Sequence, residues 1–330
     1  MTTFCLQLTR IVPLLFCGLL FPLKAAGLPA SKQTPTAAAP DIPTIPPTHA
    51  NVAYGSHERQ VLDFYRAPSA KPTPLLFHIH GGGWVRGDKA NPPALESYLK
   101  AGISVVSINY RYSWQAQLAG VQPPVKWPLE DAVRALQWVR SKASEWNVNT
   151  ARIAASGGSA GACSSLYLAL HDEMAQPQSS DPVARQSTRL WCAAVDGAQT
   201  SLDPAQLKAW TPNSRYGGHA FGFMDPMDLN TRDRRFAQFL QEREKVLPWI
   251  RAYSPIEWVS ADDPPLFLRY PDEPAMGKEQ KDPTHTVNYG VGFAEVCAAK
   301  GVRCELLYPK CPKVSATSIA EFLIQELKRP

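Results

Sequence analysis

One short string, GGSAG at residues 157–161, constrains the fold of this 330-residue chain more than any other feature. It follows the apolar run 153–155 and precedes the segment 160–171, whose residues favour a helix. The context is a strand, a sharp turn and a helix, and the string fits the G-x-S-x-G pattern. Glycine on both sides of the serine lets a strained backbone pass without a Cβ clash. The pattern predicts that Ser159 projects from this turn as a nucleophile.

A second glycine-rich string, HGGGW at residues 80–84, follows the apolar run 74–79. Taken alone, its three glycines could be only a flexible turn, but they also leave main-chain N–H groups uncovered by side chains. Such donors, together with the N-terminus of a helix, favour the oxyanion that forms when a carbonyl is attacked. We therefore expect Gly82, Gly83 and Ala160 to supply an oxyanion hole beside Ser159.

At these two strings the chain resembles the α/β-hydrolase family, specifically its hormone-sensitive-lipase-like carboxylesterase branch. The resemblance covers most of residues 54–327, and further matching fragments are GDK at 87–89, NYR at 109–111, YSP at 253–255 and DDPP at 262–265. It implies that Ser159 is the nucleophile of an acyl-transfer reaction and that Gly82, Gly83 and Ala160 bind the oxyanion. It also implies chemistry through an acyl-serine intermediate, without a metal or an organic cofactor.

Strand-like apolar runs alternate with amphipathic helical segments along the chain, which is typical of a mainly parallel sheet covered on both faces. The fold class we predict is α/β, an α/β-hydrolase fold with a cap-like insertion at about residues 200–251. We expect helices to start at Pro128, to cover 287–300, and to follow a capping box of Ser318 and Glu321. The predicted strands are 60–66, 75–80, 104–109, 152–156, 190–195, 265–270 and 304–308.

The segment 200–251 interrupts this alternation and is rich in large apolar side chains. Two interpretations stay open: these side chains line an acyl or aryl pocket, or they form a small core of the insertion itself. The residues concerned are Trp210, Tyr216, Phe221, Phe223, Met224, Met227 and Trp249.

The catalytic base is absent from the position that the resemblance implies. The family places its acid after the strand 265–270 and its histidine in the loop after the last strand, but no histidine occurs from residue 309 onward. His285 is the best remaining candidate, and Asp282 lies three residues before it. We expect His285 to accept the Ser159 proton while Asp282 holds the imidazole in the required tautomer. Asp272 could be the acid instead.

Other arrangements of the site stay open. His219, in the insertion, is a remote candidate for the base, whereas His80 is expected to brace its own loop. A serine–lysine pair would use Lys310 or Lys313, but nothing in this polar loop suggests a desolvated, neutral lysine. The alternative to an enzyme is a weak or inactive hydrolase scaffold that serves as a binding or scaffolding protein.

The N-terminus has the layout of a secretory signal, with Arg10, the apolar stretch 11–23 and small residues at 25–27. We predict a signal peptide at 1–27, a Pro/Ala/Thr-rich linker at 28–50 and a hydrolase domain at 51–330. The apolar stretch is too short to favour a membrane span, although an uncleaved anchor is an alternative. The expectation is a secreted or periplasmic protein with no stable membrane span after signal removal.

Net charge and cysteine spacing limit the classes of ligand that this protein is expected to bind. The net charge of +5 is mild and no basic block occurs, so a nucleic-acid role has little support. Of the seven cysteines, five lie beyond the signal, and none has the C-x-x-C spacing of a zinc or redox site. A disulfide among Cys297, Cys304 and Cys311 stays possible. The expected substrate is a carboxylic ester, either a small molecule or linked to a polysaccharide, with a short acyl group; the sequence does not predict the oligomeric state.

Overall fold

The computed structural model describes residues 45–223 and 228–330. The chain divides into two units, Met1–Pro43 and Thr44–Pro330, and the fold described below belongs to the second. The predicted signal peptide, most of the predicted linker, Met224 and Met227 lie outside the described residues.

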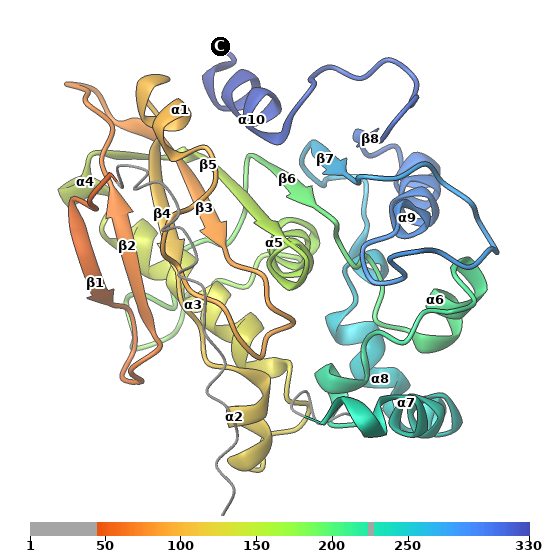
Figure 1. The fold of residues 1–330 in the computed structure, drawn as a ribbon. Helices are drawn as coiled ribbons and strands as arrows, with labels where there is room; N and C mark the ends of the chain where they lie inside the picture. Colours follow the sequence, from red (N-terminus) through yellow and green to blue (C-terminus); the bar gives the residue numbers. More distant parts are fainter. Residues whose placement is uncertain (1–44, 224–227) are drawn as a thin grey trace, which may run out of the picture. The chain divides into compact units, whose positions relative to one another are not determined.

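The fold is built on one eight-stranded sheet with the order β1-β2-β4-β3-β5-β6-β7-β8 (Figure 1). The first three strands in this order pair antiparallel, and all other neighbours pair parallel. The prediction of a mainly parallel sheet is confirmed. The strands are β1 His49–Ala53, β2 Val61–Tyr65, β3 Thr73–Ile79, β4 Ser104–Ile108, β5 Val148–Gly158, β6 Cys192–Asp196, β7 Leu266–Arg269 and β8 Cys304–Leu307.

Seven of these strands correspond to the seven predicted from apolar runs, although β5 begins four residues before the predicted start at 152. The predicted linker, 28–50, includes His49 and Ala50, so the sequence does not predict the strand β1. It is an exposed edge strand, and the His49 ring stacks on Phe64 with centroids 5.9 Å apart. Local apolar patterning therefore identifies the buried strands and misses the exposed one.

Helices cover both faces of the sheet, as alternating side chains along the strands require. On one face, α1 and α10 pack on side chains such as Leu76, Ala154 and Phe267. On the other face lie α3, α5 and α9. The helices are α1 Leu95–Lys100, α2 Ser113–Leu118, α3 Lys126–Ser141, α4 Ala143–Trp146, α5 Ala160–Leu170, α6 Pro204–Trp210, α7 Arg232–Gln241, α8 Arg243–Tyr253, α9 Val287–Lys300 and α10 Ile319–Lys328.

The helix ends largely follow the predicted signals. The helix α9 has the predicted bounds, and Pro128 lies in the first turn of α3, where a missing N–H costs nothing. Ser318 Oγ accepts the Glu321 N–H at 3.1 Å, as expected of an N-cap. The second half of the predicted capping box is different, because the Glu321 carboxylate accepts the Thr317 N–H at 2.7 Å.

The predicted insertion contains α6, α7 and α8, which lie together at the lower right of Figure 1. Its aromatic side chains pack on one another: Phe239 lies 5.6 Å from Phe221 and 5.1 Å from Phe223 between ring centroids. They also belong to the same buried cluster as Leu129 of α3 and Cys163 of α5, so the insertion extends the main core, and none of its described residues lines the pocket of Ser159. Trp210 packs instead on α9, where a Cβ at Gly292 would come within 2.4 Å of the indole.

The cysteines of the second unit are all free, namely Cys163, Cys192, Cys297, Cys304 and Cys311. The disulfide that the sequence left possible is therefore not formed in this structure. Within the described ranges, none of the helices combines the length and the apolar character that crossing a membrane requires.

Candidate active site

Ser159 lies at the turn between β5 and α5 with a strained backbone, φ 54° and ψ −123°. Its N–H donates to the Asp196 carbonyl at 2.9 Å. The flanking glycines are required by close packing against the end of β3: a Cβ on Gly157 would lie 2.4 Å from the Ile79 oxygen, and one on Gly161 only 2.1 Å from it. The spacing that identified the turn in the sequence thus corresponds to a tight backbone contact.

The predicted histidine and acid meet this serine. His285 Nε2 lies 2.9 Å from Ser159 Oγ, and His285 Nδ1 lies 2.8 Å from Asp282 Oδ2. Partial burial raises the pKa of the Asp282 carboxyl, but hydrogen bonds from His285 and from the Thr284 N–H outweigh this effect and leave the pKa below its usual value. The carboxylate at His285 is thus that of Asp282, whereas Asp272 is exposed near the end of β7.

The loop after β7 brings His285 inward through contacts that sequence reasoning did not find. Asp282 Oδ1 accepts the Thr284 N–H at 3.0 Å, and Gln199 Nε2 donates to the Thr284 carbonyl at 2.7 Å. The Tyr289 hydroxyl donates to the Pro283 carbonyl. The imidazole passes over Gly197, where a Cβ would lie 3.2 Å from that of His285. No sequence pattern identifies Gln199 or Tyr289 as a partner of this loop. Gln199 is 85 residues from Thr284 in the sequence, and Tyr289 binds Pro283 from the neighbouring helix α9.

Two of the three predicted oxyanion donors, Gly82 and Gly83, lie in the HGGGW loop, and the third, Ala160, begins α5. Gly82 and Gly83 have φ values of +100° and +63°, which side chains rarely adopt. Ala160 is the first residue of α5, so its N–H has no partner inside the helix. Within residues 45–223 and 228–330, the N–H groups of Gly82, Gly83 and Ala160 donate to no protein acceptor. These three residues are not among those that line the pocket of Ser159, so their role as oxyanion donors stays a prediction.

Tyr110 and the His80 side chain hold the start of the HGGGW loop in place through hydrogen bonds to its carbonyl groups. The Tyr110 hydroxyl donates to the His80 carbonyl at 3.0 Å and to the Gly81 carbonyl at 3.2 Å. The two rings stack with centroids 4.3 Å apart, and His80 Nδ1 lies 2.8 Å from the Gly81 oxygen. Burial lowers the pKa of His80 to about 4, so its imidazole is neutral at neutral pH. These contacts agree with the expected bracing role of His80.

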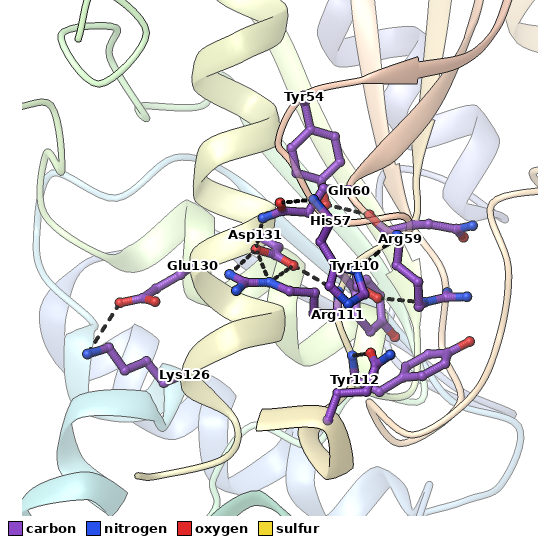
Figure 2. Close-up of polar contacts among 12 residues, drawn as sticks. Tyr54, His57, Arg59, Gln60, Tyr110, Arg111, Tyr112, Lys126, Glu130 and Asp131 are labelled. Carbon is purple, nitrogen blue, oxygen red and sulfur yellow. Dashed lines mark hydrogen bonds and ion pairs between the residues drawn. The ribbon is translucent and has the colours of Figure 1, made fainter. Parts of the chain in front are cut away.

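The NYR fragment extends this brace into a buried polar network (Figure 2). The Arg111 guanidinium binds the Asp131 carboxylate with Nη2 at 2.7 Å and Nε at 3.0 Å, and the Arg111 N–H donates to the same group at 2.8 Å. Gln60 Nε2 adds a bond of 2.7 Å, and Arg59 Nε donates to the Tyr110 carbonyl at 2.8 Å. The Asp131 side chain is only 1% exposed, and the hydrogen bonds from Arg111 and Gln60 compensate for the burial of its negative charge.

The alternative bases lie elsewhere. His219 is buried against Trp84 and Tyr216, with ring centroids 5.8 Å and 5.0 Å away, and burial lowers its pKa to about 4. The Lys310 ammonium is exposed and pairs with Glu273 at 2.6 Å, and Lys313 is exposed as well. Neither lysine has the desolvated environment that a neutral amine needs.

Ser159, Asp282 and His285 line one open pocket of about 590 Å³, which Gly81, Arg269 and others complete. Its position at the carboxyl ends of β5, β6 and β7 is the usual place for a ligand in a parallel sheet. In the part of the chain that the structure describes, no group of three or more His, Cys, Asp or Glu side chains could hold a metal ion.

Comparison with known proteins agrees with this architecture. The carbohydrate esterase from gut microbiota, in a truncated form, superposes with a TM-score of 0.61 over 84% of this chain and 95% of its own, at 20% identity. Esterase 2 of Thermogutta terrifontis, in its apo form, gives a TM-score of 0.56 over 81% and 84%, at 22% identity. Both likenesses show the fold, which confirms the predicted α/β-hydrolase architecture.

Among curated sequences, the "Probable carboxylic ester hydrolase LipM" of Mycobacterium tuberculosis is 30% identical over 230 residues, 66% of this chain and 46% of its own. The chain spans about half the length of the curated relatives it matches. The model of the BD-FAE family matches residues 62–276, which include both glycine-rich strings and end before Asp282. This match covers well over half of the chain, and the chain therefore belongs to the BD-FAE family of the α/β-hydrolase fold.

Proposed function

We propose that this protein is a serine hydrolase that cleaves carboxylic esters through an acyl-serine intermediate. The observation that carries the proposal is the row of Ser159, His285 and Asp282, with 2.9 Å between Oγ and Nε2 and 2.8 Å between Nδ1 and Oδ2. A nucleophile and a base within hydrogen-bond reach, with the base oriented by a carboxylate, are the arrangement that activates a serine.

In the proposed reaction, His285 Nε2 accepts the hydroxyl proton while Ser159 Oγ attacks the ester carbonyl carbon. The negative charge that develops on the carbonyl oxygen is stabilised by the N–H groups of Gly82, Gly83 and Ala160. His285 then gives its proton to the leaving alkoxide, and the alcohol departs. Water repeats the sequence on the acyl-serine, with His285 again as the base, and releases the carboxylic acid.

The ester as substrate class is supported by family membership and by the LipM relative, a probable carboxylic ester hydrolase by name. The acyl and alcohol groups are not specified by this likeness. We propose short acyl esters, either free or linked to polysaccharide. Export supports the polysaccharide option, since extracellular polymers are the accessible substrates of an exported enzyme. The proposal of export rests on Arg10, the apolar stretch 11–23 and the small residues that follow.

The test is hydrolysis of p-nitrophenyl acetate and butyrate by the purified protein and by its Ser159→Ala and His285→Ala variants. We expect Ser159→Ala to abolish turnover and His285→Ala to reduce kcat by about 10³-fold or more. The matched control is His57→Ala, which removes a histidine from the turn before β2, outside the pocket. It should retain the activity of the parent protein.

Each other outcome has a definite meaning. Activity that depends on Ser159 but survives His285→Ala would refute the proposed base and leave the hydrolase class intact. Folded protein that shows no serine-dependent turnover, and whose Ser159 is not labelled by a fluorophosphonate probe, would refute the enzyme and favour a binding protein. Periplasmic or secreted localisation is tested separately by cell fractionation, with and without residues 1–27.

A further inference from the structure

A second, narrower pocket opens beside the proposed active site and has no part in the chemistry described above. Its volume is about 250 Å³, and it extends over the face of the sheet that α1 and α10 cover. Five residues line both pockets: His78, Pro93, Gly158, Asp196 and Arg269. The two spaces are therefore adjacent and meet at these five residues.

The narrow pocket lies between the starts of two helices that lie side by side at the top of Figure 1. Ala94 borders it at the start of α1, and Ile319 and Ala320 border it at the start of α10. Its floor comes from β3 and β5, with Leu76 among the apolar side chains. A mostly apolar wall with a few polar groups is typical of a small-molecule site.

The junction of the two pockets carries no uncompensated charge. Arg269 Nε donates to Asp196 Oδ1 at 2.9 Å and Nη2 to Oδ2 at 2.8 Å, so the guanidinium and the carboxylate neutralise each other. The neighbouring His78 shares a hydrogen bond of 3.1 Å with Ser107, and burial lowers its pKa to about 4. Because no charge at the junction is left without a partner, we expect it to accept a neutral part of a substrate in preference to an ionised one.

We propose that the narrow pocket binds the acyl arm of the ester and extends the substrate class to neutral aryl and medium-length acyl groups. The assignment to the acyl arm follows from the position of the base. The leaving alcohol must depart beside His285, because the imidazole gives it a proton. His285 lines the wide pocket and not the narrow one.

The size of the pocket sets the length of this arm. One water needs only about 10–15 Å³ of such space, so a volume of about 250 Å³ has room for an aryl group or a medium-length acyl chain. Each methylene that leaves water for such a pocket improves binding by about fourfold. The preference should therefore rise from acetate to hexanoate or octanoate and fall for longer chains.

This inference rests on the proposed hydrolase function, and the test separates the two. We would measure kcat/KM for p-nitrophenyl acetate, hexanoate, octanoate and benzoate with the parent protein, Ala320→Leu and Ala94→Leu. The two variants fill the pocket from opposite walls, so one still tests the proposal if the other does not fold. Gln325→Leu adds the same side chain at an exposed position of α10 and is the matched control.

We expect both pocket variants to lower the ratio of octanoate to acetate kcat/KM by about tenfold or more, with acetate changed less than about twofold. Gln325→Leu should leave the ratio unchanged. An unchanged ratio in both folded pocket variants would overturn the acyl-pocket assignment while the hydrolase function stands.

A second readout does not need turnover. Octanoate and acetate binding to Ser159→Ala is measured by calorimetry, with and without the added Ala320→Leu substitution. Tighter binding of octanoate, weakened about tenfold by Ala320→Leu, would support the pocket even if the protein hydrolysed no ester. Equal binding of the two acids would refute the pocket even if the hydrolase proposal were correct.

Discussion

His285 Nε2 and Ser159 Oγ lie 2.9 Å apart although 126 residues separate them in the sequence. The histidine stands after β7 and not after β8, three residues from the carboxylate that holds it, so acid and base share one loop. The Asp282 side chain is half exposed, so burial does little to fix its position. Hydrogen bonds within the loop, such as the one from the Thr284 N–H, hold the carboxylate beside His285.

The first prediction concerns this carboxylate. Asp282→Asn should reduce kcat by about 10²- to 10⁴-fold, because an amide no longer secures the tautomer in which Nε2 accepts a proton. KM should change little. The pH–rate profile of the parent and the variant checks this, with Asp272→Asn as the control that should keep full activity. Equal losses in both variants would contradict the assignment of Asp282 as the acid.

The second prediction uses the glycines at the turn. Gly161→Ala should lower the free energy of unfolding by roughly 1–3 kcal/mol and kcat by more than tenfold, because its Cβ would lie 2.1 Å from the Ile79 oxygen at the root of the HGGGW loop. Gly158→Ala is the matched control for the free energy of unfolding, since its Cβ would be 3.9 Å from the nearest atom. Urea unfolding and kcat are the measurements, and equal effects on unfolding at both positions would show that the contact is unimportant.

The third prediction tests the brace below the oxyanion loop. Tyr110→Phe removes the hydroxyl that donates to the His80 and Gly81 carbonyls and should cost about 1 kcal/mol of stability. We expect kcat to fall about tenfold with KM nearly constant, because the loop donors act mainly in the transition state. Tyr112→Phe, which removes a bond to the Gly87 carbonyl, should leave kcat nearly unchanged. A rise in KM with kcat unchanged, or equal losses of kcat in the two variants, would contradict the bracing role.

The sequence predicts the buried part of this fold well, for a physical reason. Strands β3 to β7 are covered on both faces, so their apolar runs stand out from the polar loops. The exposed strand β1 has no such run and exists only because β2 offers it hydrogen bonds. Similarly, Ser159 was identified by a local pattern, because the glycines beside it meet Ile79 in a contact that allows no side chain.

The position of the base was harder to predict, because it depends on contacts between distant segments. His285 was selected by elimination, and its approach to Ser159 requires Gln199 and Tyr289 to hold the backbone of the loop. The pocket beneath α10 was not predicted at all. It lies between the first residues of α1 and α10, which are more than two hundred residues apart in the sequence. A pocket between such distant segments leaves no local sequence pattern.

The last prediction concerns stability in mild acid. Burial lowers the pKa of His78, His80 and His219 to about 4, below the ordinary value of 6.5. Between these values the unfolded chain binds protons that the folded protein excludes. The stabilisation is therefore complete above pH 6.5 and is lost as the pH falls toward about 4. Each histidine contributes a slope of at most about 1.4 kcal/mol per pH unit.

Replacing His219 should remove one of these three contributions. We expect His219→Phe to reduce the pH dependence of the unfolding free energy by up to about 1.4 kcal/mol per pH unit near the middle of the window. Tyr216→Phe is the matched control: it changes the same buried cluster, but burial raises the pKa of the Tyr216 hydroxyl far above this range. It should shift the curve without changing its slope. Urea unfolding from about pH 7 to about pH 4.5 measures both, and an unchanged slope in His219→Phe would mean that His219 takes up its proton in the folded protein as readily as in the unfolded chain.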